Sequence, residues 1–257
     1  ELRKRLKEPA PGRVQILAGP RQVGKTTLLL EMAELFGDSA LYIAADAPEA
    51  SLAGWWEIQW RRAEEMAARK KAVLLIDEIQ YISTWPKLLK NRMDKVYRKK
   101  VPLHVVVTGS SALRLGAGSR ETMAGRFERL SILHWPVSEV VCRFRIKENR
   151  ALMSSVTRGT YPGAVRFWND PVRWRAYLRD SIIEPAIGKD VLMMESIRKP
   201  ELLRQVFAIA AGHPAEIVSL QKIVGRLNEK SALETVAHYL HVLEEACLVA
   251  GLEKYSH

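Results

Sequence analysis

The sequence has few cysteines and no long hydrophobic run, and each of these features argues against certain classes of protein. Cys142 and Cys247 are the only cysteines in 257 residues, and neither has the C-x-x-C or histidine spacing of a zinc site. Neither a disulfide framework nor a structural zinc is therefore expected. His238 and His241 are three residues apart without a third ligand in view, so they do not indicate a metal site. No apolar run approaches the roughly 18 residues of a membrane span, so no membrane partner is expected.

The sequence also lacks an internal repeat, a low-complexity segment and a secretory signal. Residues 1–7 are basic, but no apolar segment follows them, and a cytoplasmic location is expected by default. Hydrophobic residues make up 47% of the chain and charged residues 27%, which is a composition typical of soluble globular proteins. The length suits one large domain or two ordinary ones, and we expect two.

Positive charge exceeds negative charge, but only in the first part of the chain. The formal net charge is +11. Residues 1–150 hold 27 Lys+Arg and 17 Asp+Glu, whereas residues 151–257 hold 13 and 12. Because a clustered basic surface is the electrostatic footprint of nucleic-acid contact, any such contact is expected in the first part.

Five short apolar runs alternate with helical stretches in the first part of the chain. The runs cover residues 14–18, 41–45, 72–76, 103–107 and 130–134. This alternation predicts an α/β fold, in which helices cover both faces of a mostly parallel sheet. In such a sheet the ligand binds at the carboxyl ends of the strands.

After Pro136 the strand signal fades, and helical stretches broken by glycine and proline follow. We expect a first domain over residues 1–140, a helical lid or linker over 141–200 and a last domain over 201–257. Within the last domain, helices are expected over 202–211, 220–227 and 232–246, followed by a strand-like run over 247–252. Three helices and a strand in this order outline a winged helix.

Residues 19–26 read G-P-R-Q-V-G-K-T, a full match to the phosphate-binding pattern G-x-x-x-x-G-K-[ST]. A β-type run leads into the motif and a helical pattern leads out of it, as the motif requires. Glycine lets the backbone close on a phosphate, and the N-terminus of the helix adds its partial positive charge. Lys25 is expected to reach the β- and γ-phosphates, and the Thr26 hydroxyl to hold Mg²⁺. The nucleotide-binding residues are expected to be Gly19, Pro20, Arg21, Gln22, Val23, Gly24, Lys25, Thr26 and Thr27.

Two acidic residues, Asp77 and Glu78, follow the third apolar run. A buried parallel strand reads as a continuous apolar run, so its end emerges beside the phosphate loop. There Asp77 is expected to hold the water shell of Mg²⁺, and Glu78 to orient and deprotonate the attacking water. Together with the phosphate loop, the pair predicts hydrolysis and not only binding. ATP is favoured over GTP because no N-K-x-D guanine signature is present.

Two more positions are candidates for the catalytic site. The fourth run leads into Thr108-Gly109-Ser110-Ser111, where Thr108 and Ser110 are candidate sensors of the γ-phosphate. The alternative for this turn is a simple helix start. Arg126, just before the fifth run, is a candidate guanidinium for the developing charge, from the same chain or from a neighbour. The alternative is a solvated arginine. Action on a neighbour would make the active unit a homo-oligomer.

These motifs, including Ile76-Asp77-Glu78-Ile79-Gln80, resemble the AAA-type ATPases of bacteria and archaea that accompany a DUF4143 region, a family similar to AAA_14. The similarity continues into G-T-Y-P-G at residues 159–163 and T-V-A-H-Y-L-H-V-L-E at residues 235–244, which resemble that family's lid and winged-helix segments. It covers nearly the whole chain.

The resemblance implies an AAA-type P-loop fold with ATP and Mg²⁺ as ligands. It implies that Lys25 and Thr26 contact phosphate and magnesium, that Asp77 and Glu78 form the Walker B pair, and that residues 108–110 are a sensor. Arg126 would be the arginine finger or a sensor. Family members usually run on past the winged helix into a nuclease-like domain, and no nuclease chemistry is expected from the residues present here.

The stronger candidate for a DNA contact is a basic helix of the first part, not the winged helix. The helix over 231–246 contains three glutamates and no Lys or Arg, whereas phosphate neutralisation supplies much of the affinity for DNA. That helix is expected to pack against protein or to need the wing to grip DNA. The basic side chains of the helix after Glu78 are Lys87, Lys90, Arg92, Lys95, Arg98, Lys99 and Lys100, against Asp94 alone. The alternative is a solvated face whose last-turn cations suit the helix dipole.

The sequence therefore predicts a Mg²⁺-dependent AAA-type ATPase. ATP binding and hydrolysis would drive a rearrangement of domains or subunits, with DNA as a candidate partner. A competing function is a nucleotide-dependent switch or scaffold with slow or no turnover. A third is a DNA-binding regulator that ATP gates.

Overall fold

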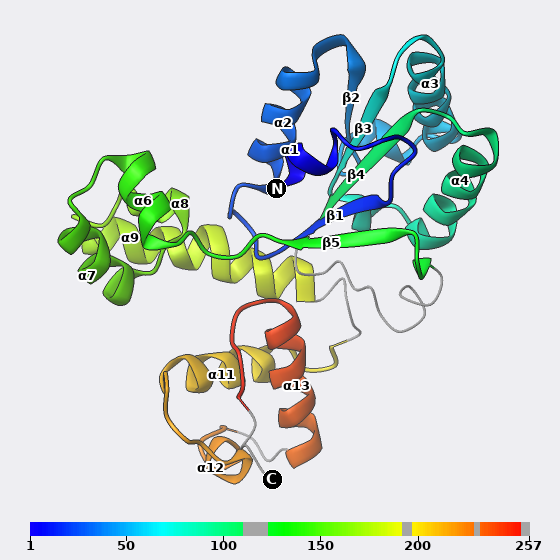
Figure 1. Ribbon diagram of the computed structural model, residues 1–257. Coiled ribbons are helices and arrows are strands. Elements are labelled where there is room, and N and C mark those ends of the chain that lie inside the picture. Colours follow the sequence, from blue (N-terminus) through cyan, green and yellow to red (C-terminus); the bar gives the residue numbers. More distant parts are fainter. Residues whose placement is uncertain (110–122, 192–196, 229–231, 253–257) are drawn as a thin grey trace, which may run out of the picture. The chain divides into compact units, whose positions relative to one another are not determined.

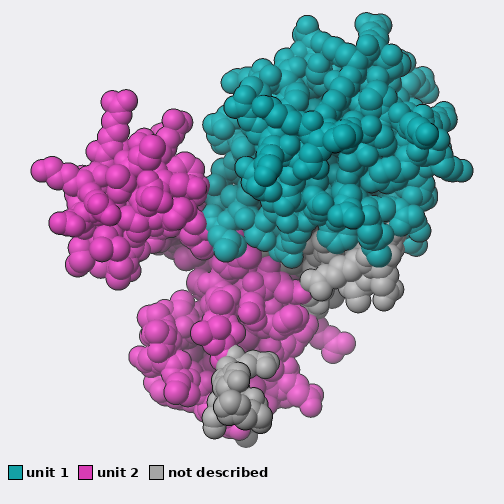
Figure 2. Space-filling view, viewed as in Figure 1, with its two compact units in different colours: residues 1–19, 23–133 teal, residues 20–22, 134–257 magenta. Residues whose placement is uncertain are grey.

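The computed structural model describes residues 1–109, 123–191, 197–228 and 232–252, in two compact units (Figures 1 and 2). Unit 1 contains residues 1–19 and 23–133, and unit 2 contains residues 20–22 and 134–257. The phosphate loop thus contributes residues to both units. Among the described residues, no helix combines the length and hydropathy of a membrane span.

Unit 1 is built around a five-stranded sheet in the order β2-β3-β4-β1-β5, and every strand pair is parallel. Its strands are β1 (Val14–Ala18), β2 (Ala40–Ala44), β3 (Ala72–Asp77), β4 (Leu103–Gly109) and β5 (Phe127–Ser131). Its helices are α1 (Leu2–Arg5), α2 (Lys25–Phe36), α3 (Trp55–Arg69) and α4 (Trp85–Lys99), with 3₁₀ turns η1 (Gly37–Ser39), η2 (Pro48–Ser51) and η3 (Ile79–Tyr81). The predicted α/β fold with a parallel sheet is confirmed.

The burial of each strand explains how accurately its position was predicted from the sequence. Every residue of β1, β3 and β4 is buried, and strands buried on both faces read as continuous apolar runs. Edge strand β5 instead carries half-buried and exposed residues, among them Glu128 and Arg129. The apolar run predicted over residues 130–134 therefore began three residues too late.

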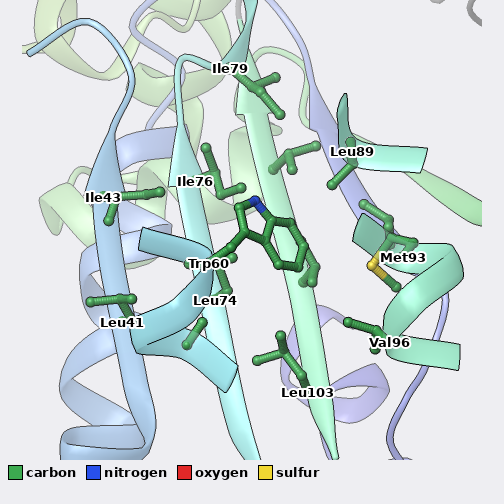
Figure 3. Packing of buried hydrophobic residues seen from close by; sticks show 14 of the residues in the cluster. Leu41, Ile43, Trp60, Leu74, Ile76, Ile79, Leu89, Met93, Val96 and Leu103 are labelled. Atoms are coloured by element: carbon green, nitrogen blue, oxygen red, sulfur yellow. The ribbon is translucent and has the colours of Figure 1, made fainter. Parts of the chain in front are cut away.

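Helices cover both faces of the sheet, as Figure 1 shows. On one face, α3 and α4 pack Trp60 and Met93 against Ile76 and its neighbours (Figure 3). On the other face, α2 packs Leu29 against Leu75. Successive strand residues point to opposite faces, so adjacent residues of β3 serve two separate cores. Packing in both cores stabilises the sheet from which the phosphate loop extends.

The regular secondary structure in the described residues of unit 2 is all helical. Its helices are α6 (Val137–Phe144), α7 (Glu148–Arg158), α8 (Pro162–Val165), α9 (Pro171–Tyr177), α11 (Pro200–Ala211), α12 (Leu220–Val224) and α13 (Leu233–Glu245), with π-helical turns η4 (Leu178–Ile183) and η5 (Ala186–Val191). Leu203, Val242 and Leu243 belong to a core that joins α11 and α13. Residues 247–252 do not form the expected strand. A strand needs a partner for its backbone groups, and none pairs with them among the described residues.

Candidate nucleotide site

The phosphate loop runs from the carboxyl end of β1 into α2, and two of its glycines have steric reasons to be there. A Cβ on Gly19 would lie 1.8 Å from the carbonyl oxygen of Ile132. Gly24, the residue before α2, has φ 100° and ψ 19°, a left-handed conformation that favours glycine. The backbone path of the loop therefore depends on glycine at both ends of the motif.

Lys25 is the first residue of α2 and is only 5% exposed. Its Nζ donates a hydrogen bond of 3.0 Å to the carbonyl oxygen of Gly19, so the ammonium lies across the phosphate loop. Thr26 and Thr27 follow in the first helical turn and are exposed. A buried ammonium beside exposed backbone and hydroxyl groups at a helix N-terminus suits a polyphosphate.

The middle of the loop, residues 20–22, groups with unit 2. Gln22 has φ 57°. Its Nε2 donates to the carbonyl oxygen of Ser181 at 2.8 Å, and its Oε1 accepts from the Tyr177 hydroxyl. Pro20 is buried and Arg21 is half-buried. Sequence reasoning missed Tyr177 and Ser181, because no local pattern ties residues so distant in the chain to the loop.

Asp77 ends β3 and is 3% exposed. Its Oδ1 accepts from the Thr108 hydroxyl and from the backbone N–H of Glu78, the latter at 3.1 Å. Its Oδ2 accepts from the Tyr42 hydroxyl at 3.1 Å. Burial, and then the charge of Asp77, raise the pKa of Tyr42, which keeps that hydroxyl a donor. The Asp77 carboxylate is therefore held on both oxygens.

Glu78 follows directly, in a left-handed conformation with φ 51° and ψ 44°. Its N–H also lies 3.2 Å from the Thr108 hydroxyl oxygen, and its carboxylate accepts a hydrogen bond from Nε2 of Gln80. Sequence reasoning named Gln80 only as part of the motif that carries the resemblance, without a role, and did not single out Tyr42. Tyr42 sits inside an apolar run, and only the pairing of β2 with β3 reveals its role.

The strand order explains why these residues meet. Strand β4 lies between β1 and β3, so Thr108, which is fully buried, stands between the phosphate loop and Asp77. The carboxyl ends of parallel strands share one edge of the sheet. Lys25, Thr108 and the acidic pair are thus brought to that edge. Ser110, the other sensor candidate, lies outside the described residues.

Arg126 does not join this group. Its carbonyl oxygen accepts from the N–H of Val14 at 2.9 Å, which places it at the amino edge of the sheet. The five residue steps from Val14 to Gly19 span about 16 Å at roughly 3.3 Å each. Its Nε donates to Asp94 Oδ1 at 2.8 Å, and its Nη1 to the carbonyl oxygen of Ala124 at 3.2 Å. Arg126 and the phosphate loop therefore lie at opposite edges of the same sheet.

An open depression of about 690 Å³ surrounds Arg126. Its lining residues are Asp94, Tyr97, Arg98, Ala124, Gly125 and Arg126. The side chain of Arg126 is 34% exposed in this depression. A guanidinium that is held through Nε and Nη1 but partly exposed can meet an anion brought by another molecule.

The basic side chains of α4 divide into two groups. Lys87, Lys95 and Arg98 are exposed, at spacings that place them on one helical face. Lys99 and Lys100 are also exposed, whereas Lys90 is half-buried. Arg92 is 19% exposed and lies 3.9 Å from Glu57 of α3. Arg92 therefore belongs to the packing of α4 on α3 rather than to the exposed face on which the sequence placed it.

The donor set suits a magnesium ion held largely by its substrate. Within residues 1–109, 123–191, 197–228 and 232–252, no three or more His, Cys, Asp or Glu side chains are grouped so that they could hold a metal ion. Mg²⁺ is usually bound through one or two carboxylates together with phosphate oxygens and waters. The Asp77 carboxylate and the Thr26 hydroxyl are the oxygens that would hold it, and its charge would offset that of the phosphates.

The sheet and loop define an α/β P-loop nucleotide-binding protein. Residues 11–141, about half of the chain, match the family model described as AAA domain, AAA_14, and the chain belongs to that family. Residues 149–257 match a domain of unknown function, DUF8612. The resemblance had implied a DUF4143 region instead, so the family of the second half is different from the one expected.

Relatives cover most of this chain. An uncharacterized protein of Haemophilus influenzae is 21% identical over 266 residues, which include 94% of this chain and 62% of the relative. An uncharacterized protein of Mycobacterium tuberculosis is 27% identical over 244 residues, with shares of 93% and 49%. The chain thus spans less than two thirds of either relative. AMPPCP-bound DnaA from Aquifex aeolicus is 14% identical with a TM-score of 0.47, covering 95% of this chain and 86% of that one.

Proposed function

We propose that this protein binds ATP and hydrolyses it in a Mg²⁺-dependent reaction. The observation that supports this most strongly is the set of buried polar groups at one sheet edge: Lys25 on the phosphate loop, Asp77 after β3 and Thr108 on β4. Buried ionisable groups are costly unless they are paired or used. Their placement at the carboxyl edge of a parallel sheet is that of a ligand site.

Each residue has a distinct task in the proposed reaction. Lys25 and the loop N–H groups bind the β- and γ-phosphates, and Thr26 with Asp77 holds the metal. Glu78 orients a water and takes its proton as that water attacks the γ-phosphate, whose bond to the bridging oxygen breaks as ADP leaves. The Thr108 hydroxyl donates a hydrogen bond to Asp77 and so holds the acidic pair in position beside the loop.

The first test is phosphate release with and without Mg²⁺. The wild-type protein should release phosphate from ATP with Mg²⁺ and stop when a chelator removes the ion. Lys25→Ala should bind ATP at least about tenfold more weakly, because a charged hydrogen bond contributes about 1.5–3 kcal/mol. Lys70→Ala, at an exposed lysine, is the matched control. Release by Lys25→Ala at the wild-type rate would contradict the proposal.

Tight Mg²⁺–ATP binding without turnover would instead support the competing switch or scaffold.

The loop contributes residues to both units, and Gln22 is hydrogen bonded to Tyr177 and Ser181. A bound phosphate that reshapes the loop would act on these bonds. We therefore propose that ATP binding and hydrolysis drive a rearrangement of domains or subunits.

We propose further that Arg126 acts on the nucleotide of a neighbouring copy. Within its own subunit it lies at the edge of the sheet opposite the phosphate loop, where Asp94 holds its Nε. A homo-oligomer that places this depression against the next copy's ATP would supply the missing guanidinium. The rate of ATP turnover per protein molecule should then rise with protein concentration, which a phosphate-release assay at several concentrations measures.

DNA is the second candidate partner, and the exposed face of α4 favours it. Lys87, Lys95 and Arg98 project from one face, with no exposed acidic residue in that row. Helix α13 is the weaker candidate, because Glu234 and Glu244 are exposed on it and it contains no Lys or Arg. Phosphate contacts favour the cationic face.

Charge reversal tests this DNA contact. The double variant Lys95→Glu/Arg98→Glu should bind duplex DNA at least about tenfold more weakly at low salt, and its salt slope should fall by about 1–2 units. The control variant, Lys4→Glu/Lys7→Glu, makes the same change in net charge at exposed residues in and just after α1. Helix α1 packs on the other face of the sheet. This variant should keep the wild-type affinity for DNA. Equal DNA affinity in both double variants would exclude the α4 face.

A further inference from the structure

Gln80 lies beside the acidic pair, in a position that neither the phosphate loop nor the strand ends explain. It follows Glu78 by two residues within η3, next to Ile79, which belongs to the core of unit 1. Its Nε2 donates a hydrogen bond to Oε2 of Glu78. The orientation of the amide follows from its partner, because a carboxylate accepts hydrogen bonds and the amide nitrogen is the donor.

The other end of the same amide is unsatisfied. Oε1 of Gln80 is buried and has no hydrogen-bond partner in the part of the chain that the structure describes. A buried acceptor without a partner destabilises the folded state. An apolar side chain of similar length would avoid that cost, so packing alone does not account for glutamine at this position.

We propose that Gln80 is a positioning residue for the proposed hydrolysis, which sets the direction of the Glu78 carboxylate. This inference rests on the proposed function. The Glu78 backbone is already fixed by its N–H, which contacts Asp77 and Thr108. The carboxylate beyond that backbone is held by the hydrogen bond from the Gln80 amide, which restricts the rotation of the Glu78 side chain. A base must lie within hydrogen-bond reach of the water that it deprotonates, so its direction controls the rate.

The role predicts a loss of turnover without a loss of binding. Gln80→Met removes the donor at similar side-chain length, and kcat should fall about tenfold. Gln80→Glu replaces the donor by a second carboxylate, which repels Glu78, and kcat should fall about 100-fold. The affinity for ATP should stay within about twofold in both variants, because the phosphate loop is unchanged. Gln80→Met also removes the orphaned acceptor, so its melting temperature should equal or exceed that of the wild type.

The control is Gln59→Met, the same substitution at a buried glutamine of unit 1. Gln59 accepts from Arg62 on α3 and has no contact with the acidic pair among the described residues. This variant should keep the wild-type kcat. A general disturbance of unit 1 would lower both kcat values alike.

The closing experiment is a double-variant cycle of Glu78→Gln and Gln80→Met, with kcat, ATP affinity and melting temperature measured for each protein. If Gln80 acts through Glu78, Gln80→Met should change kcat by less than about twofold once the carboxylate is gone. A full tenfold loss in that background, or no loss in the wild-type background, would overturn the inference alone. Wild-type turnover no higher than that of Glu78→Gln would overturn the proposed hydrolysis and the inference together.

Discussion

Glu78→Gln should lower ATP turnover by about 10²–10⁴-fold, the usual contribution of a general base, while the protein keeps its nucleotide. The amide has the shape of the carboxylate but does not take a proton from water. Its carbonyl oxygen still accepts from Gln80, so the local geometry is preserved. Lys25 and the phosphate loop are untouched, so binding survives. Phosphate release and titration with a fluorescent ATP analogue measure the two effects separately.

The matched control for this prediction is Glu57→Gln. Glu57 lies on α3 with its side chain 55% exposed and 3.9 Å from Arg92, and its replacement removes one negative charge far from the loop in sequence. Turnover should stay at the wild-type level. If Glu78→Gln hydrolyses ATP as fast as this control, the proton goes elsewhere and Glu78 is not the base.

Arg126→Ala should lower turnover by about 10³–10⁵-fold, the range for an arginine that stabilises the charge of a transferring phosphoryl group. The physical reason lies in its position, because Arg126 is at the amino edge and the phosphate loop at the carboxyl edge of one sheet. We therefore expect it to act on a second copy. ATP affinity should change little, since the substitution leaves the protein's own loop intact.

Mixing two inactive variants tests the exchange between copies. Glu78→Gln has an intact Arg126 but no base, and Arg126→Ala has an intact base but no guanidinium. In an oligomer, mixed interfaces combine the two intact residues, so the mixture should regain turnover that neither variant shows by itself. A mixture no more active than the sum of its components, together with turnover independent of protein concentration, would refute action in trans. Lys95→Ala, on the same helix as Asp94, is the control for local disturbance.

Much of the fold could be predicted because its signals are local. Residues 72–77 form a buried strand whose apolar run needs no knowledge of its neighbours. The glycines and the lysine of the phosphate loop are fixed by their spacing from one another. The edge strand β5 was misplaced by three residues because Glu128 and Arg129 face partly toward solvent and interrupt its apolar pattern.

The candidate site was only partly predictable, because several of its contacts join residues that are distant in the chain. Tyr42 meets Asp77 through the pairing of β2 with β3. Arg126 and Asp94 come together only because β5 begins beside α4 at the amino edge. Arg92 likewise turns from the predicted basic face to Glu57. The number of basic residues along a helix does not reveal which of them pair with acidic residues of a neighbouring helix.

The sequence by itself determined the α/β class, the phosphate loop and the acidic pair, since each is written in spacings of a few residues. Only the tertiary structure decided that β4 separates the loop from Asp77, that Thr108 and Tyr42 hold that carboxylate, and that Arg126 lies out of reach. The physical reason is that strand order is set by packing of whole elements on two cores, and no short stretch of sequence carries that information.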